Sequence, residues 1–276
     1  MKSMTFGKIV IATILAMISS VCLAFGTGNM PSVPAGWTLK EAGINVRVYQ
    51  KGTEQVYAQV VDIKGGGKIR FIQTVSSNVG NKTFTRQTLD QWWSSYSGSK
   101  VTMINGQFFD NAVTPTPFSF GVRANGSLLT YGSDTSVVPK KQVEFYDNTG
   151  VLVTSWNNAR LNGGSSAQNI IVGLDPSFDK QSGWSIGRTY VCSKVNPVGP
   201  TSPSQWFVIV SAQGSTQPGI LANINSWGCD AGSVVMFDGS GSTQFKTAAG
   251  IRMNGYGAPF WTENRPIPQT LAISNN

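Results

Sequence analysis

The alternation of apolar and polar residues in this chain is mostly that of β-strands. Strands are expected where the alternation holds or where a short apolar run ends at turn residues, namely residues 45–49, 55–63, 68–74, 100–104, 119–124, 128–131, 143–146, 151–156, 170–174, 184–192, 206–212 and 234–237. Successive runs are separated by residues that favour tight turns: Lys64-Gly65-Gly66-Gly67, Asn125-Gly126 and Asn148-Thr149-Gly150. The pattern therefore predicts a chain built largely from hairpins.

Two segments depart from this alternation and predict short helices. Residues 85–93 place their apolar side chains on one side after Thr85 as the N-cap, and residues 217–227 follow a Gly-Ser-Thr triplet. The adjacent Trp92 and Trp93 would suit a sugar ring, but at helical spacing behind a cap they are expected in the core. The sequence thus predicts an α+β fold, a single β-rich domain with a mixed sheet and a few short helices packed on it.

The N-terminal segment predicts a secretory signal peptide. Two lysines precede an apolar run over residues 9–21, and small residues lie where a cleavage after Ala24 requires them. A membrane anchor fits less well because the run is short, and a lipoprotein fits less well because Val21 precedes Cys22. We expect a secreted or periplasmic protein without stable membrane insertion, organised as a signal peptide (1–24), a flexible leader (25–43) and one domain (44–276).

Cys192 and Cys229 would remain after cleavage. In an oxidising compartment they are expected to form a disulfide. Two separate buried thiols remain the alternative, because sequence alone does not show that two cysteines are close.

Composition restricts the chemistry. The chain has no histidine, which excludes catalytic triads, histidine metal sites and an imidazole base. Its 21 Lys and Arg against 13 Asp and Glu give a net charge of +8, which favours anionic partners. The basic residues are scattered singly and no nucleic-acid-binding motif is present, so nucleic acid is not the expected partner.

Two predicted strands end in polar residues followed by glycine. The run over residues 234–237 ends at Asp238, which Gly239-Ser240-Gly241 follows, and the strand over residues 100–104 ends at Asn105-Gly106. Glycine permits close approach of a ligand or of another backbone. An Asp-Gly pair also makes an ordinary hairpin turn, which is the alternative for Asp238. Two such strand ends suggest one pocket.

Four motifs together resemble the phosphodiester glycosidase family. In chain order they are Asn105-Gly106-Gln107-Phe108-Phe109, Arg188-Thr189, Asp238-Gly239-Ser240-Gly241-Ser242, and Arg265 in an Arg-Pro-Ile-Pro turn. The resemblance covers residues 44–273. It implies a hydrolase that cleaves the bond between the anomeric carbon of a sugar and a phosphodiester, with a phosphate-bearing glycan as substrate.

The resemblance also implies roles for individual residues. Asp238 is the expected catalytic carboxylate and Asp110 a weaker second candidate. The expected substrate-binding residues are Asn105, Gly106, Arg188, Thr189, Gly239, Ser242 and Arg265. The two arginines would neutralise the phosphate, although a structural salt bridge for Arg188 and a solvated surface position for Arg265 are the alternatives.

Some features leave the function open. Gln107 and Ser240 stand where the family has glycine, so the width of the pocket and the identity of the substrate are in question. A non-catalytic module that binds an anionic cell-surface glycan is the alternative function. No cofactor is assigned, although a divalent cation such as calcium could bind near Asp238 and Asp110 through oxygen ligands. The sequence does not indicate an oligomeric state.

Overall fold

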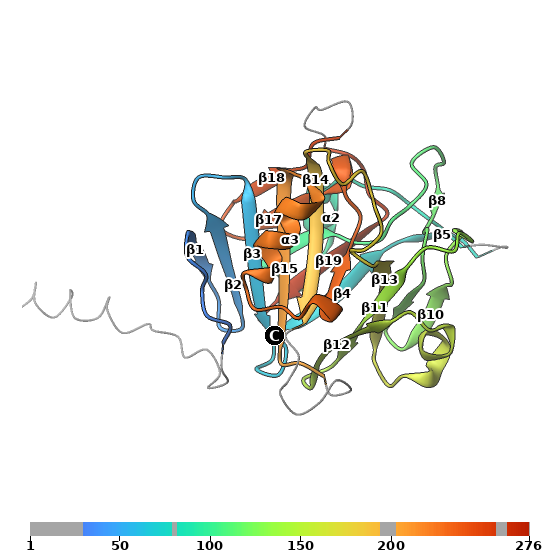
Figure 1. Ribbon diagram of the computed structural model, residues 1–276. Coiled ribbons are helices and arrows are strands. Elements are labelled where there is room, and N and C mark those ends of the chain that lie inside the picture. The colour runs from blue at the N-terminus through green and yellow to red at the C-terminus, as the bar shows by residue number, and fades with distance from the viewer. Residues whose placement is uncertain (1–29, 79–81, 194–202, 258–263, 276) are drawn as a thin grey trace, which may run out of the picture.

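The computed structural model describes residues 30–78, 82–193, 203–257 and 264–275. The predicted signal peptide and the start of the leader lie outside these residues. The described chain is β-rich with few short helices, as predicted (Figure 1). Its strand pairs are all antiparallel within the described ranges, which differs from the predicted mixed sheet.

The strands form three sheets. The 11-stranded sheet runs in the order β1 (Trp37–Ala42), β2 (Val46–Lys51), β3 (Val56–Asp62), β15 (Trp206–Ser215), β14 (Ile186–Ser193), β16 (Val234–Met236), β13 (Asn169–Leu174), β11 (Lys140–Tyr146) and β12 (Gly150–Ser155), and β13 also pairs with the hairpin of β9 (Val122–Ala124) and β10 (Ser127–Thr130). The five-stranded sheet runs β18 (Arg252–Asn254), β17 (Gln244–Thr247), β7 (Thr102–Asn105), β19 (Gln269–Ser274) and β4 (Lys68–Gln73). The small sheet contains β5 (Val75–Ser77), β6 (Thr83–Phe84) and β8 (Thr116–Pro117).

The two larger sheets pack face to face and a helix covers each outer face. Alternate residues of β3 point to opposite sides: Tyr57 and Val61 lie in the core between the sheets, whereas Ala58 and Val60 face α3 (Gln217–Asn225). Helix α2 (Leu89–Ser95) packs on the outer face of the five-stranded sheet. Both faces of the central strands are therefore covered, which explains why every residue of β3 is buried.

Two predicted boundaries are wrong. Strand β1 lies in the segment expected to be a flexible leader, because Trp37 packs against Trp227 with ring centroids 5.4 Å apart and the strand pairs with β2. Helix α2 begins after Thr88 rather than Thr85. Gln87 is held in a β-bridge to Ile267, so the helix starts only after Thr88, which is the N-cap and forms a capping box with its N3 residue.

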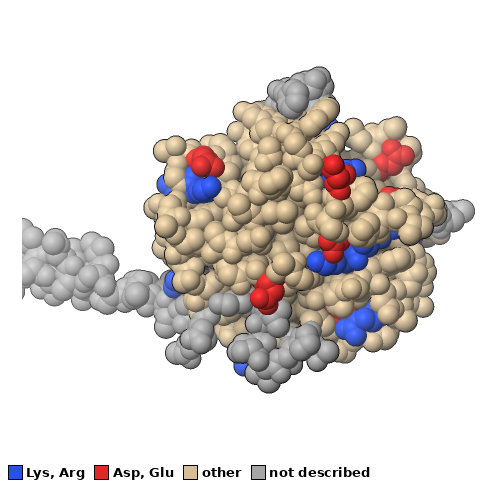
Figure 2. Space-filling view, in the orientation of Figure 1, with Lys and Arg blue, Asp and Glu red and all other residues tan. Residues whose placement is uncertain are grey.

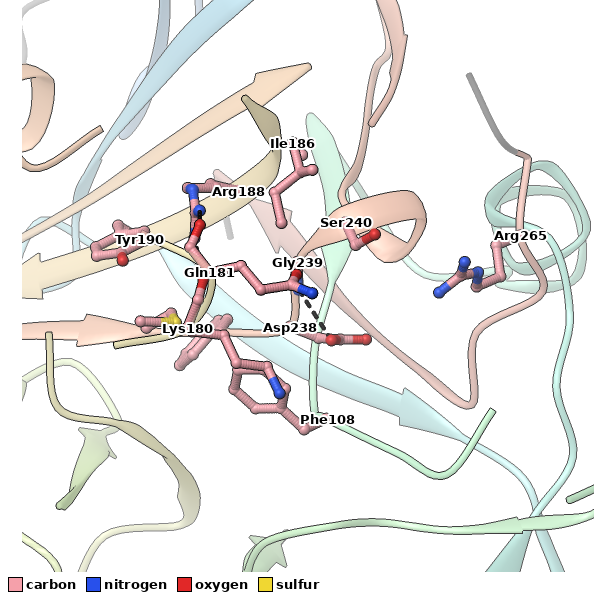
Figure 3. Close-up of a pocket in the computed structure, with 13 residues that line it drawn as sticks. Phe108, Lys180, Gln181, Ile186, Arg188, Tyr190, Asp238, Gly239, Ser240 and Arg265 are labelled. Atoms are coloured by element: carbon pink, nitrogen blue, oxygen red, sulfur yellow. Dashed lines mark hydrogen bonds between the residues drawn. The ribbon is translucent and has the colours of Figure 1, made fainter. Parts of the chain in front are cut away.

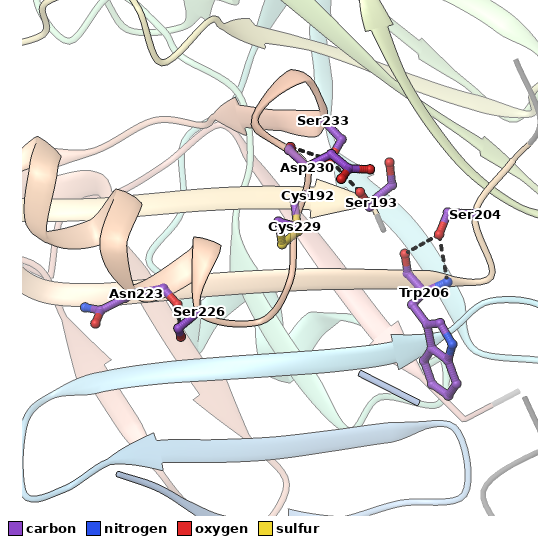
Figure 4. Close-up of a disulfide and its surroundings, with 9 residues drawn as sticks. All are labelled: Cys192, Ser193, Ser204, Trp206, Asn223, Ser226, Cys229, Asp230 and Ser233. Carbon is purple, nitrogen blue, oxygen red and sulfur yellow. Dashed lines mark hydrogen bonds between the residues drawn. A yellow bond between two sulfur atoms is a disulfide. The ribbon is translucent and has the colours of Figure 1, made fainter. Parts of the chain in front are cut away.

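Cys192 and Cys229 form a disulfide (Figure 4). The bond joins β14 to the segment that follows α3 and closes a loop with a sequence separation of 37 residues. Separate thiols are thereby excluded as the alternative. The link holds α3 and the following turn against the outer face of the large sheet, where Cys192 is completely buried.

The surface agrees with the scattered charge of the sequence. On the face shown in Figure 2, Lys and Arg side chains lie in small separate groups, several beside acidic residues, on a mostly uncharged surface. Within the described ranges, no helix is long and apolar enough to cross a membrane.

Candidate functional site

Asp238 lies where the chain crosses from the large sheet to the five-stranded sheet. It follows β16 after one residue. The amide of Phe237 donates to Thr189 in the large sheet at 3.0 Å, and the amide of Asp238 donates to the carbonyl of Gly106, just after β7, at 3.4 Å. The turn Ser240–Ser242 then leads into β17. The buried strand therefore surfaces at Asp238, as predicted.

The Asp238 carboxylate faces a pocket of about 90 Å³ (Figure 3). Four separate segments line the pocket and bring one carboxylate together with three cationic side chains. Among the lining residues are Phe108, Lys180, Gln181, Arg188, Asp238, Ser240 and Arg265. Within the described chain this is an acid surrounded by positive charge, an arrangement suited to an anionic ligand.

The pocket changes the acidity of Asp238. Burial raises the pKa of its carboxyl from 3.8 to about 6. Hydrogen bonds from the Ser242 hydroxyl and the Gly239 amide, and the charges of Arg265 and Lys180, oppose this increase. Near neutral pH the group is therefore a carboxylate with the proton affinity of a useful base.

Asn105 and Thr189 support Asp238 from behind the pocket wall. Asn105 is 1% exposed; its amide donates to the backbone carbonyl of Asp238 at 2.8 Å, and its Oδ1 accepts from the Thr189 hydroxyl at 2.9 Å. Both side chains point into the space between the sheets and bond to protein groups, and neither lines the pocket as the predicted substrate-binding role requires. Gly106 and Ser242 are likewise supporting residues, Ser242 through its bond to the carboxylate.

Arg188 borders the pocket, but its donors are used by the protein. The guanidinium donates to the backbone carbonyls of Lys180, Gln181, Trp184 and Ser215 at 2.6–3.2 Å, and the residue is 2% exposed. These acceptors are all backbone carbonyls, so the contacts match neither predicted role of Arg188, the phosphate ligand or the salt bridge to a carboxylate. Arg188 instead holds the loop between β13 and β14 against the pocket.

That loop supplies two pocket residues that the sequence did not reveal. Lys180 and Gln181 are exposed at the pocket mouth, and Gln181 has a left-handed backbone with φ 54°. Their segment is polar and lacks periodicity, so no local signal distinguished them from other surface residues. The bonds from Arg188, together with a bond from the Lys180 amide to the Gln217 side chain, hold them beside the pocket.

Arg265 reaches the pocket from the opposite side (Figure 3). Its backbone carbonyl accepts from the Gln244 side chain at 2.6 Å, which fixes the turn that carries it. The guanidinium is near enough to lower the pKa of Asp238. Its expected role as a phosphate ligand stays a prediction.

Asp110 is not part of this pocket. The residue is exposed, it is absent from the residues that line the cavity around Asp238, and its carboxylate accepts from the amide of Ala112 at 2.8 Å. A divalent cation does not fit either, because the donor set around Asp238 contains Lys180 and Arg265 rather than a second carboxylate. No group of three acidic or cysteine side chains that could hold a metal occurs within the described ranges.

The two departures from family glycines have different consequences. Gln107 is buried and turns away from the pocket; its amide donates to the carbonyl of Val172 at 2.9 Å. Ser240 does line the pocket and has φ 57°, a left-handed conformation that favours glycine. The backbone carbonyl of Ser240 also lies close to Gly187: a Cβ added to Gly187 would be 2.1 Å from the Ser240 oxygen. Only Ser240 therefore affects the pocket.

We expect Arg188→Ala and Lys180→Ala to differ in their effects. Loss of Arg188 leaves several carbonyls without their donor, so the free energy of unfolding should fall by about 3 kcal/mol and activity should fall with it. Lys180→Ala should reduce activity while the melting temperature holds. Calorimetry and steady-state kinetics on both variants check this. Arg188→Lys keeps the charge but not the planar set of guanidinium donors, so it should behave like Arg188→Ala. An unchanged melting temperature in Arg188→Ala would contradict its role in holding the loop.

The fold resembles that of the phosphodiester glycosidase class. A solved structure of this class is the catalytic domain of zebrafish N-acetylglucosamine-1-phosphodiester alpha-N-acetylglucosaminidase, auto-inhibited by its pro-peptide, which matches with a TM-score of 0.55 and 13% identity over 86% of this chain and 81% of that chain. No protein-family model and no curated protein matches the sequence. At this identity the likeness concerns the fold, and for the fold it confirms the predicted resemblance.

Proposed function

We propose that this protein is an exported hydrolase that cleaves the bond between the anomeric carbon of a sugar and a phosphodiester in an anionic glycan. The observation that carries the proposal is Asp238, a carboxylate with a raised pKa between Lys180 and Arg265 in one pocket. The similar zebrafish enzyme is named for action on an N-acetylglucosamine-1-phosphodiester. This supports the reaction class and leaves the sugar unspecified.

In the proposed mechanism, water attacks the anomeric carbon directly. Asp238 removes a proton from a water molecule whose oxygen bonds to the anomeric carbon as the bond from that carbon to the phosphate oxygen breaks. The bonding electron pair leaves with the phosphate, whose charge Lys180 and Arg265 stabilise. A phosphate is a good leaving group, so no strong general acid is required. The products are a free sugar and a phosphomonoester.

The proposal is tested by incubating the protein with a panel of sugar-1-phosphodiesters and measuring free sugar. Early products observed by NMR should have the inverted anomeric configuration, because water attacks directly; retention would instead make Asp238 a nucleophile. Binding of the anionic compounds without release of sugar would contradict hydrolysis and favour a non-catalytic glycan-binding module.

The pH dependence follows from the raised pKa of Asp238. Because the base must be ionised, kcat/KM should increase as pH rises through about 6. Lys180→Ala removes a charge that lowers this pKa, so the midpoint should move to higher pH. Profiles of both proteins on one substrate check this. A midpoint near 4 in the wild type would contradict the role of Asp238 as the base.

A further inference from the structure

A second cavity lies beyond the Asp238 pocket and has two exposed aromatic rings in its wall. The cavity is about 210 Å³ in volume and is lined in part by Tyr131, Trp156, Lys140 and Asn158. Tyr131 is 48% exposed and Trp156 is 39% exposed. Two large rings left open beside polar groups are typical of a ligand-binding groove rather than of a folding core.

The Trp156 ring is held in place before any ligand arrives. The ammonium of Lys140 lies 5.1 Å from the centroid of the Trp156 ring and 5.0 Å from that of Phe120. The backbone amide of Trp156 also donates to the carbonyl of Lys140 at 3.2 Å. A fixed ring loses little conformational freedom when a ligand stacks on it, which favours binding.

A third cavity, of about 190 Å³, lies between the two. It shares Phe120 and Asp134 with the aromatic cavity, and it shares Lys180 and Asp238 with the candidate active site. The three cavities are therefore neighbours in a row from the carboxylate, past Lys180, to Trp156, and this row is called the groove below. Since Lys180 is on this path, the groove continues on the side where the phosphate would lie.

Polar groups accompany the rings along the groove. The Asp134 carboxylate accepts from the amide of Ser136 at 2.7 Å; burial would raise its pKa, but that bond and the charges of Lys140 and Lys180 lower it overall. Asp134 is thus an ionised acceptor in the wall shared by two cavities, and Asn158 offers an amide beyond it. Flat apolar rings beside such acceptors match a pyranose, which has one C–H face and a rim of hydroxyls.

We propose that Tyr131 and Trp156 form a distal subsite for a hexopyranose ring on the phosphate side of the substrate. The inference rests on the proposed function and deepens it: the substrate is a glycan that continues beyond the cleaved bond, rather than a sugar phosphodiester with a small alcohol. The part that keeps the phosphate after cleavage occupies the groove.

The test compares two substrates that differ only on the phosphate side. One is a hexose-1-phosphate methyl diester, and the other carries a hexopyranose in place of the methyl group. Trp156→Ala and Tyr131→Ala should each lower kcat/KM for the longer substrate about tenfold and leave that for the methyl diester unchanged. Trp156→Phe, which keeps a flat ring, should retain most of the activity on the longer substrate.

Trp93→Ala is the matched control, because Trp93 also lies under a lysine, with Lys100 5.1 Å from its ring centroid, but on α2. It should not change the ratio of kcat/KM between the two substrates. Equal losses on both substrates in Trp156→Ala, or no loss on either, would overturn the subsite.

A failure of the proposed hydrolysis can be distinguished from a failure of the subsite. If the wild type cleaves neither diester, the subsite is judged by NMR titration of the full protein with a neutral methyl hexopyranoside. Shifts of the Trp156 indole N–H that Tyr131→Ala weakens would support the subsite without hydrolysis. Absence of these shifts would overturn it.

Discussion

Replacing Asp238 by Asn should lower kcat by about 10³-fold on any sugar-1-phosphodiester that the wild type cleaves. The change keeps the size of the side chain and an oxygen that can accept from Gly239, but removes the base. The free energy of unfolding should increase at neutral pH, because the pKa of the carboxyl is raised to about 6 in the folded protein and the ionised group opposes folding. Kinetics and chemical denaturation at pH 7 measure the two effects.

The sign of the stability change can be followed with pH. Between pH 3.8 and about 6 the folded wild type binds more protons than the unfolded chain, so its stability falls as pH rises through this interval. Above it, Asp238→Asn should be more stable than the wild type by roughly 2 kcal/mol. Asp110→Asn is the control, since that exposed carboxylate should affect neither quantity. Retention of kcat within tenfold in Asp238→Asn would exclude it as the base.

Glu144→Gln should cause a large loss of stability without a direct effect on the pocket. The side chain is 0% exposed and forms a salt bridge with Arg160 at 2.6 Å. Burial would raise its pKa, but hydrogen bonds from Arg160, Ser165, Tyr146 and Gln142 lower it from 4.5 to about 2. The neutral amide loses the charge and places an amino group among these donors. We expect the free energy of unfolding to fall by about 3 kcal/mol at pH 7.

The pH dependence of this contribution has the opposite sign to that of Asp238. Because the folded pKa of Glu144 is depressed, its stabilisation is complete above about pH 4.5 and is lost as pH falls toward 2. Denaturation curves at several pH values should therefore converge for the wild type and Glu144→Gln in acid. The salt bridge of Arg70 with Asp147 offers a control: it lies at the surface, with side chains 36% and 50% exposed, so Asp147→Asn should have little effect. A constant gap across the whole range would contradict the titration of Glu144.

The local features of the fold could be predicted from the sequence. The hairpins at Asn125-Gly126 and Asn148-Thr149-Gly150 follow from residues that adopt left-handed turns; Asn125 and Asn148 have φ 50° and 56°. The position of Asp238 could also be predicted from the sequence, because an apolar run that ends in an acid and small residues marks the end of a buried strand. These are short-range effects, so neighbouring residues are sufficient to determine them.

The composition of the pocket was decided by the tertiary structure. Asn105 and Arg188 stand on strands as predicted, yet the packing of the sheets turns both side chains toward protein groups, Asp238 in one case and the loop at Lys180 in the other. Lys180 has no sequence signal at all. It lines the same pocket as Asp238, a residue far along the chain, because Arg188 and Gln217 hold its backbone there. Long-range contacts of this kind depend on which sheets face each other, and the spacing of residues in the sequence does not contain that information.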